Sequence, residues 1–369
     1  MATDYSLRLA RLKERRQGVE QATLSKAFAA YYPQSESASF REAYENRGKT
    51  DTVKYVLGAM QEVDQKYTQT SFDEGKRVIN QLQNRLTNFG INSEFEFQGS
   101  VPLNIHIKQH SDIDVLVIHG DILTYDSYGI HGSSGHYKPI TGTVLQRMLG
   151  LRNACESSLD AAFWGADINK AGAKSIALNG GAFKRKVDVV PSHWHDTALY
   201  QRTREKHYRE IKILDKFVPE TLSNLPFLHM KMINDKDAEC GGGIKKVIRL
   251  LKTLKADCDK AINLSSYDIA SIVWHFNSTS VWQRANRDLA LLAMTMDELD
   301  AMCGNYTRAS LMITPDGSRK IFDDAQKFTD LNKLASEVRG TASDIAGELD
   351  CFAAYRVEGV QSVLESTFV

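Results

Sequence analysis

The chain is 369 residues long, and its 46 basic residues balance 46 acidic ones, so the formal net charge is zero. With 42% hydrophobic residues it can build a large core, whereas the balanced charge argues against a protein that chiefly coats nucleic acid. No apolar run approaches the roughly 18 residues of a membrane span, the first residues lack a signal sequence, and the five cysteines are scattered without a CxxC pair. We therefore expect a cytoplasmic protein that lacks disulfides and structural zinc.

The first 48 residues are polar and are expected to form an N-terminal helical extension. From Thr50 to about Asn88, apolar residues recur every three or four positions, which predicts a long helical stretch. Gly90 suits the position that follows the end of a helix. The recurring residues are Val53, Val56, Leu57, Met60, Val63, Val78, Leu82 and Leu86.

A Gly-Ser pair and two aspartates come next. Gly99 and Ser100 are expected to form a turn, and Asp112 and Asp114 open an apolar strand that runs to Ile118. Because side chains alternate along a strand, the two carboxylates project from the same face. Gly99 lets the backbone approach a phosphate, and Ser100 offers a hydroxyl group and an amide hydrogen.

A third aspartate lies in the clearest hairpin, which follows a helix expected over residues 141–162. Residues 175–178 predict a strand, Asn179-Gly180 a turn, and residues 183–190 a returning strand that ends at Pro191. Asp188 lies in this apolar returning strand, so its ionised carboxylate requires a partner. A cation shared with the other two aspartates would be such a partner.

The rest of the chain is mainly helical. Residues 208–216 predict an edge strand that continues in residues 228–233. The apolar spacing then predicts helices over residues 244–258, 266–276, 284–304 and 326–349. These elements together predict an α+β protein with a front lobe, made of a mixed sheet and a long helix, at 49–225 and a helical lobe at 226–369. The active site would lie in the cleft between the lobes.

Two features of the helical part are candidates for nucleotide binding. Lys245, Arg249 and Lys252 share one face of a helix, which either reaches the phosphates of a nucleotide or forms a solvated face. Ser265, Ser266 and Tyr267 open the next helix. Either a serine hydroxyl group and the ring of Tyr267 contact a nucleotide, or Ser265 or Ser266 only caps the helix.

The three aspartates fit two-metal phosphoryl transfer. Carboxylates that bridge two metal ions about 4 Å apart lower the pKa of an attacking hydroxyl group and hold the triphosphate. We therefore expect Asp112, Asp114 and Asp188 to be both catalytic and metal-binding, with two Mg²⁺ ions, or Mn²⁺ in their place, as cofactor.

Three segments resemble the polymerase-β-like nucleotidyltransferase superfamily: Phe97 to Ser100, Asp112 to Val117, and Lys186 to Pro191. Three later segments resemble the branch that contains the cyclic-GMP-AMP synthases, the oligoadenylate synthases and the bacterial CD-NTases: Ile233 to Asp237, Gly243 to Lys255, and Ser265 to Tyr267. CD-NTases make cyclic oligonucleotide signals in anti-phage defence of the CBASS type. The resemblance covers about residues 50 to 290.

The resemblance implies roles for particular residues. Gly99 and Ser100 would bind the triphosphate, the three aspartates two Mg²⁺ ions, Lys245 or Arg249 the phosphates, and Ser266 with Tyr267 the nucleotide. The substrates would be ATP and other nucleoside triphosphates, and the partners regulatory proteins and a downstream effector that responds to the product. No Cys/His cluster matches the zinc insertion of the animal sensors, which argues against activation by nucleic acid.

We therefore expect a Mg²⁺-dependent nucleotidyltransferase that condenses ribonucleoside triphosphates into a cyclic di- or oligonucleotide and releases pyrophosphate. One alternative is a toxin-type nucleotidyltransferase that modifies tRNA 3′ ends or protein side chains. Another is a nucleotide-binding regulatory subunit without turnover, although three retained carboxylates speak against it because clustered negative charge is unfavourable.

Overall fold

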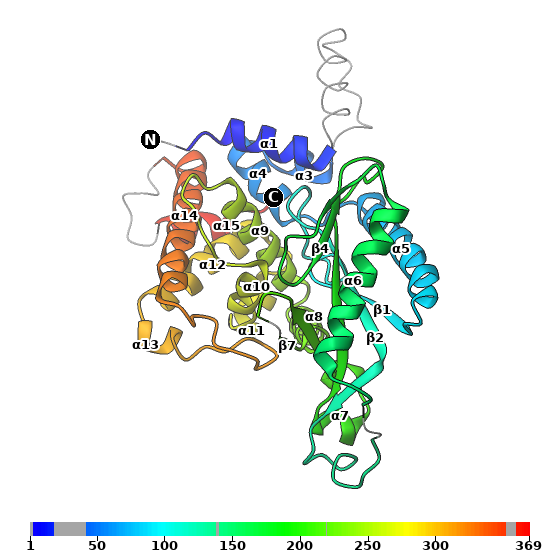
Figure 1. Cartoon of the computed structure of the whole chain (residues 1–369). Coiled ribbons are helices and arrows are strands. Elements are labelled where there is room, and N and C mark those ends of the chain that lie inside the picture. The colour runs from blue at the N-terminus through cyan, green and yellow to red at the C-terminus, as the bar shows by residue number, and fades with distance from the viewer. Residues whose placement is uncertain (1–2, 18–41, 138–139, 219, 352–358) are drawn as a thin grey trace. The chain divides into compact units, whose positions relative to one another are not determined.

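The structure is a computed structural model that describes residues 3–17, 42–137, 140–218, 220–351 and 359–369. Its residues gather in two compact units. The helical unit comprises Met1–Val63, Ile105–His110 and Ile233–Val369, and the sheet unit comprises Asp64–Asn104 and Ser111–Met232. The colours of Figure 1 show how segments distant in sequence contribute to these units. Residues 18–41 of the expected N-terminal extension lie outside the described residues.

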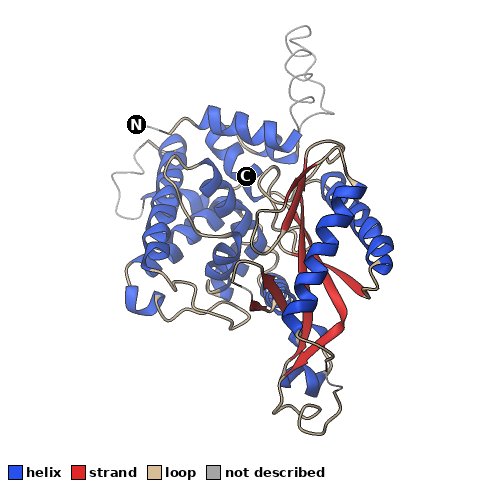
Figure 2. Cartoon of the chain, in the orientation of Figure 1, coloured by secondary structure: helices blue, strands red, loops and turns tan. Residues whose placement is uncertain are grey.

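The sheet unit is built on a mixed seven-stranded sheet, drawn red in Figure 2. The order of the main path is β1-β2-β5-β4-β3, and β6 pairs with β5 and β7. The two long central strands, β2 and β5, are parallel, and their neighbours run antiparallel to them. The strands are β1 (Ser93–Gln98), β2 (Ile113–Tyr125), β3 (Asp167–Asn169), β4 (Ile176–Asn179), β5 (Val187–Asp196), β6 (Glu210–Asp215) and β7 (Glu220–Asn224).

Alternation along β2 separates two cores. Val115 and Val117 pack with the helices α5 (Gln65–Asn88) and α6 (Val144–Ala162), whereas Leu116 and Ile118 pack on the opposite face with Trp194 and other residues. Because Asp114 has the same parity as Leu116, its side chain belongs to the face that α5 and α6 do not cover. Three shorter elements also belong to this unit, namely α7 (Ala198–Thr203), a 3-10 helix (Lys206–Tyr208) and the first part of α8 (Pro226–Glu239).

In the helical unit, capping side chains fix where several helices begin. For example, the side chain of Thr50 accepts a hydrogen bond from the backbone of Val53, and Ser265 forms a capping box with Asp268. None of the helices among the described residues is long and apolar enough to cross a membrane. Besides the end of α8, the helices are α1 (Tyr5–Gln17), α3 (Ala43–Arg47), α4 (Asp51–Met60), α9 (Gly243–Asp257), α10 (Ser266–Trp274), α11 (Ser278–Arg284), α12 (Asp288–Cys303), α13 (Tyr306–Ala309), α14 (Ala325–Leu349) and α15 (Gly359–Ser366).

Three sequence predictions about elements were wrong in detail. The helical stretch from Thr50 is two helices, because Asp64 caps a new one. Residues 228–233 belong to helix α8 instead of a strand, and Pro226 at its first position suits a helix start. Strand β5 continues through Pro191. On one edge of β5, the pairing with β4 ends at Val189 of β5 and the pairing with β6 starts at Ser192 of β5, so Pro191 lies between the two pairings. That edge of β5 therefore accommodates a residue without an amide hydrogen.

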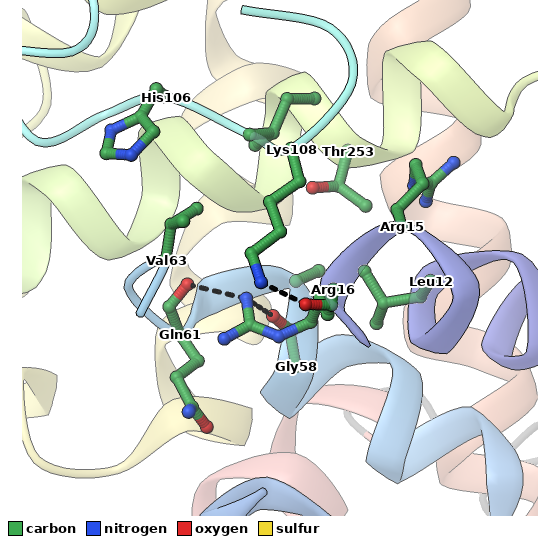
Figure 3. A pocket seen from close by; sticks show the side chains of 11 residues that line it. Leu12, Arg15, Arg16, Gly58, Gln61, Val63, His106, Lys108 and Thr253 are labelled. Atoms are coloured by element: carbon green, nitrogen blue, oxygen red, sulfur yellow. Dashed lines mark hydrogen bonds between the residues drawn. The ribbon is translucent and has the colours of Figure 1, made fainter. Parts of the chain in front are cut away.

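The spacer between the Gly-Ser turn and Asp112 belongs to the helical unit. Its Lys108 donates a hydrogen bond to the backbone oxygen of Arg16 on α1, and the guanidinium of Arg16 donates to the carbonyls of Gly58 and Gln61 (Figure 3). Lys252 on α9 donates to the carbonyl of Ile105 at 2.8 Å. The cavity in Figure 3 has a volume of about 10 Å³, which leaves room for no ligand larger than water.

Candidate active site

Three polar side chains lie in one row across the sheet. Strand pairing places Gln98 of β1 opposite Asp114 of β2, and Asp114 opposite Asp188 of β5. On the far side of Asp188, the register with β4 places the small residue Ala177. Paired residues on neighbouring strands project from the same face, so this row gathers one amide and two carboxylates at the end of the parallel pair where Asp112 precedes β2.

Lys186 joins two of the three predicted aspartates. Its ammonium nitrogen lies 2.5 Å from Oδ2 of Asp112 and 3.1 Å from Oδ2 of Asp188. The two carboxylates therefore both contact the ammonium group of Lys186. The Oδ2 atoms of Asp112 and Asp188 cannot lie farther apart than the sum of these two distances. Although burial acts to lower the pKa of Lys186, the hydrogen bond to Asp112 and the charge of Asp188 raise it above its usual value. The side chain is thus a cation held between two anions.

Asp188 is the more buried partner and is electrostatically strained. Only 17% of its side chain is exposed, against 35% for Asp112. Burial raises the pKa of Asp188 above its usual value, the charge of Lys186 opposes this shift, and the charge of Asp112 adds to it. The second oxygen of this carboxylate, Oδ1, is buried and has no hydrogen-bond partner. A buried anionic oxygen without a partner is a vacant ligand for a cation.

The turn at Gly99 fits closely around Asp114. Gly99 has φ +87°, a backbone conformation that residues with a side chain rarely adopt, and a Cβ there would lie 2.2 Å from Oδ2 of Asp114. Glycine is therefore required for two reasons, the backbone angle and the space beside the carboxylate. Ser100 follows in the same turn and is half-buried.

The residues present fit a divalent cation in part. Among the residues that the structure describes, no three His, Cys, Asp or Glu side chains form a group that could hold a metal ion. Asp112 and Asp188 nevertheless converge, Oδ1 of Asp188 lacks a partner, and the ammonium of Lys186 lies between the two carboxylates. Oxygen ligands of this kind suit Mg²⁺. The three-aspartate metal site stays a prediction, and two of its members are already adjacent.

The basic residues predicted on α9 lie in different environments. Arg249 and Lys252 are 3% and 4% exposed, and they donate hydrogen bonds of 2.8 Å to the carbonyls of Met60 and Ile105. Burial lowers the pKa of Arg249 to about 10. Lys245 is half-buried with its ammonium 3.9 Å from Asp237. Nucleotide binding by these residues stays a prediction, and the observed contacts of Arg249 and Lys252 hold α4 and the spacer in place.

The serine and tyrosine predicted to contact a nucleotide lie at the start of α10. Ser265 caps the helix, so Ser266 is not needed for capping and is exposed to solvent. The hydroxyl group of Tyr267 donates to Asp316 at 2.6 Å, and the guanidinium of Arg319 lies 5.1 Å from the centre of its ring. Burial, followed by this hydrogen bond, raises the pKa of Tyr267 to about 12. Their role in nucleotide binding stays a prediction.

Sequence reasoning missed two residues of the site. Lys186 is two positions before Asp188, so strand alternation alone predicts that they share a face. Gln98 directly precedes the Gly-Ser turn, and its Oε1 is buried without a hydrogen-bond partner. Its place beside Asp114 follows from the pairing register of β1 and β2, which only the fold reveals.

Comparison with known proteins identifies relatives along most of the chain. Residues 231–341 match the model of the cGAS/DncV-like nucleotidyltransferase C-terminal helical domain. A cyclic dinucleotide synthase, CdnE, of Yersinia aleksiciae is 40% identical over 359 residues, which cover 94% of this chain and 93% of that protein. A c-di-GMP synthase of Capnocytophaga granulosa is 31% identical over 320 residues, covering 81% of this chain and 89% of that protein.

A solved structure supports the same relationship. The STING-associated CdnE c-di-GMP synthase of Capnocytophaga granulosa superposes with a TM-score of 0.72 at 26% identity. The match covers 94% of this chain and all of that one. The similarity therefore includes both the strands that carry the aspartates and the helical segments.

Proposed function

Because this chain belongs to the cGAS/DncV-like nucleotidyltransferases, the CD-NTase family, we propose that it condenses two ribonucleoside triphosphates into a cyclic dinucleotide. In each of two steps a ribose hydroxyl group attacks an α-phosphorus. The new phosphorus–oxygen bond forms while the bond to pyrophosphate breaks, and the hydroxyl proton passes to a base. The product is proposed to act on a downstream effector in anti-phage defence of the CBASS type.

The observation that carries this proposal is the convergence of Asp112 and Asp188 beside the Gly99 turn, with one oxygen of Asp188 left without a partner. Asp112, Asp188 and Asp114 would hold Mg²⁺, which supplies positive charge against the triphosphate and lowers the pKa of the attacking hydroxyl group. Burial raises the pKa of Asp188 above its usual value, and a carboxylate with a higher pKa is a stronger base for that proton. The turn at Gly99 and Ser100 would offer backbone and hydroxyl donors to the phosphates.

The test is incubation of the purified chain with α-³²P-labelled GTP, ATP and their mixture in Mg²⁺ or Mn²⁺. We expect a phosphatase-resistant product whose mass is that of a cyclic dinucleotide. GTP alone is the first substrate to try, because the Capnocytophaga granulosa relative is named a c-di-GMP synthase. Asp114→Asn should abolish the product, whereas Asp167→Asn, an exposed change on β3, should not.

Two results would contradict the proposal. Label that appears on added tRNA or on protein instead of in small products would indicate the toxin-type activity. A folded preparation that forms no product with any mixture in either metal would exclude the synthase under those conditions and favour a binding-only role.

A further inference from the structure

The sheet unit contains a second pocket at the opposite end of its two long strands from the aspartates. Its volume is about 610 Å³, within the usual range for sites that bind small molecules. It is lined by residues of β2, β5, α6 and α7 and of the loops beside them. Asp114 lies at the start of β2, and the lining residues Gly120 and Leu123 lie farther along it, so the pocket is roughly 20–30 Å along the strand from the row of carboxylates. Figure 1 shows α7 at this far end of the strands.

Three arginines give the pocket its charge. The Nε of Arg209 donates to Asp196 at 2.6 Å, so its charge is balanced. Arg147 donates to the carbonyl of Thr141 at 2.9 Å, and Arg204 is exposed. Neither Arg147 nor Arg204 forms an ion pair with a carboxylate of the described chain, although Asp121 also lines the pocket. Two guanidinium groups therefore remain available for an anion.

Arg204 has an unfavourable backbone conformation. It follows α7 with φ +62°, and its amide donates to the carbonyl of Tyr200 at 2.8 Å to end the helix. Glycine is the residue that suits this position, because it has no Cβ to oppose a positive φ. The chain nevertheless has an arginine at this position, and its side chain lines the pocket.

Tyrosine rings lie beside these charges. The guanidinium groups of Arg209 and Arg204 are 5.1 and 5.8 Å from the centre of the Tyr200 ring. Tyr137 stacks on Tyr125 with ring centres 4.1 Å apart and planes 15° from parallel, and its hydroxyl donates to Asp196 at 2.9 Å. Flat rings and guanidinium planes are surfaces on which a planar ring stacks.

From this combination we propose that the pocket binds a nucleotide, meaning an anion that joins phosphate to a planar ring. Arg147 and Arg204 contact the phosphate, and the base lies against the tyrosines. Two sources share this chemistry: a nucleoside triphosphate, or the cyclic dinucleotide product if the proposed function is correct. The site is distinct from the row of aspartates, so binding here does not depend on catalysis.

The test measures binding by calorimetry in buffer with EDTA, using GTP, cyclic di-GMP, inorganic pyrophosphate and a single-stranded decanucleotide as separate ligands. Hydrogen–deuterium exchange locates the site. We expect GTP or cyclic di-GMP to protect the backbone of residues 196–209, and the tighter of the two identifies the source. Arg204→Gly and Arg147→Gln should each weaken this binding about tenfold.

Arg204→Gly separates ligand binding from a structural role. The variant relieves the positive φ, so its melting temperature should be equal to or above that of the wild type although its binding is weakened about tenfold. Arg202→Gln, an exposed change on α7 that does not line the pocket, should leave binding unchanged. The proposal is wrong if no ligand protects this segment, if pyrophosphate binds as tightly as the nucleotides, if only the decanucleotide binds, or if Arg204→Gly binds normally.

Discussion

Asp188 combines a buried carboxylate with an oxygen that no protein group satisfies. Its neighbours on the strand are apolar, and its partners Lys186 and Asp112 act on its charge in opposite directions. The raised pKa means that folding favours the protonated form. Buried charges of this kind are typical of functional sites. They lower the stability of the folded protein, and they leave groups available to bind a ligand.

We predict that Asp188→Asn stabilises the metal-free protein at neutral pH while abolishing activity. Burial raises the folded-state pKa above the usual Asp value of 3.8, so the wild type loses stability as the pH rises from that value through the folded-state pKa. Asparagine does not titrate. The melting temperature of the variant should be higher by on the order of 2 °C at pH 7.5.

The difference in melting temperature between Asp188→Asn and the wild type should become smaller as the pH is lowered towards 4. Calorimetry in EDTA measures both melting temperatures. Asp160→Asn is the matched control, because Asp160 is exposed and paired with Lys170 on the surface. A lower melting temperature for Asp188→Asn at pH 7.5 would show that ionised Asp188 stabilises the fold instead.

At the scale of elements, α1 packs as an integral helix of the helical unit. Leu12 is 4% exposed, and a Cβ on Gly58 of α4 would approach Leu12 to 2.8 Å, so the two helices are in close contact. Arg15 forms a two-point ion pair of 2.5 and 2.6 Å with Asp257 of α9, and Tyr55 of α4 donates to the same carboxylate at 2.9 Å. These contacts join α1 and α4 to the helix that follows the sheet unit in sequence.

Replacing Leu12 by alanine should therefore destabilise the protein by about 2–4 kcal/mol, because it removes a side chain from a tightly packed contact. Leu7 lies on the same helix but is 47% exposed, so Leu7→Ala should change the free energy of unfolding by less than about 0.5 kcal/mol. Urea unfolding of both variants provides the comparison. Equal effects of the two changes would mean that α1 does not pack as described.

At the scale of the whole molecule, the chain passes repeatedly between the two units. The helical unit receives segments from both ends of the sequence and the spacer 105–110, whereas Gly99 and Asp112 on either side of that spacer belong to the sheet unit. The family resemblance inferred from the motifs and the expected combination of a mixed sheet with a helical lobe are confirmed by the relatives and the superposition. The predicted domain limits at residues 48 and 225 stay a prediction.

Ligand binding at the aspartates should be visible in the stability of the whole chain. A ligand that binds only the folded state stabilises it, by about 2.7 kcal/mol at a hundred times its dissociation constant. Mg²⁺ with a non-hydrolysable GTP analogue should therefore raise the melting temperature by several degrees. With Arg204→Gly present in every protein compared, so that binding at the second pocket is weakened, Asp112→Asn should lose most of this rise relative to its own ligand-free value, and Asp167→Asn should keep it. An equal rise in Asp112→Asn would place the bound ligand elsewhere.

The amino-acid sequence by itself determined the family of this protein and its class of fold. Turn residues and strand alternation act over a few positions, so the turn at Gly99 and the strand around Asp188 follow from the local pattern. The shared face of Asp112 and Asp114 stays a prediction. Only the tertiary structure decided that Lys186 joins two of the carboxylates, that Gln98 lies beside Asp114, and that Lys252 is buried against the spacer. These arrangements depend on strand register and on packing between residues far apart in sequence, and no local pattern of residue types specifies either.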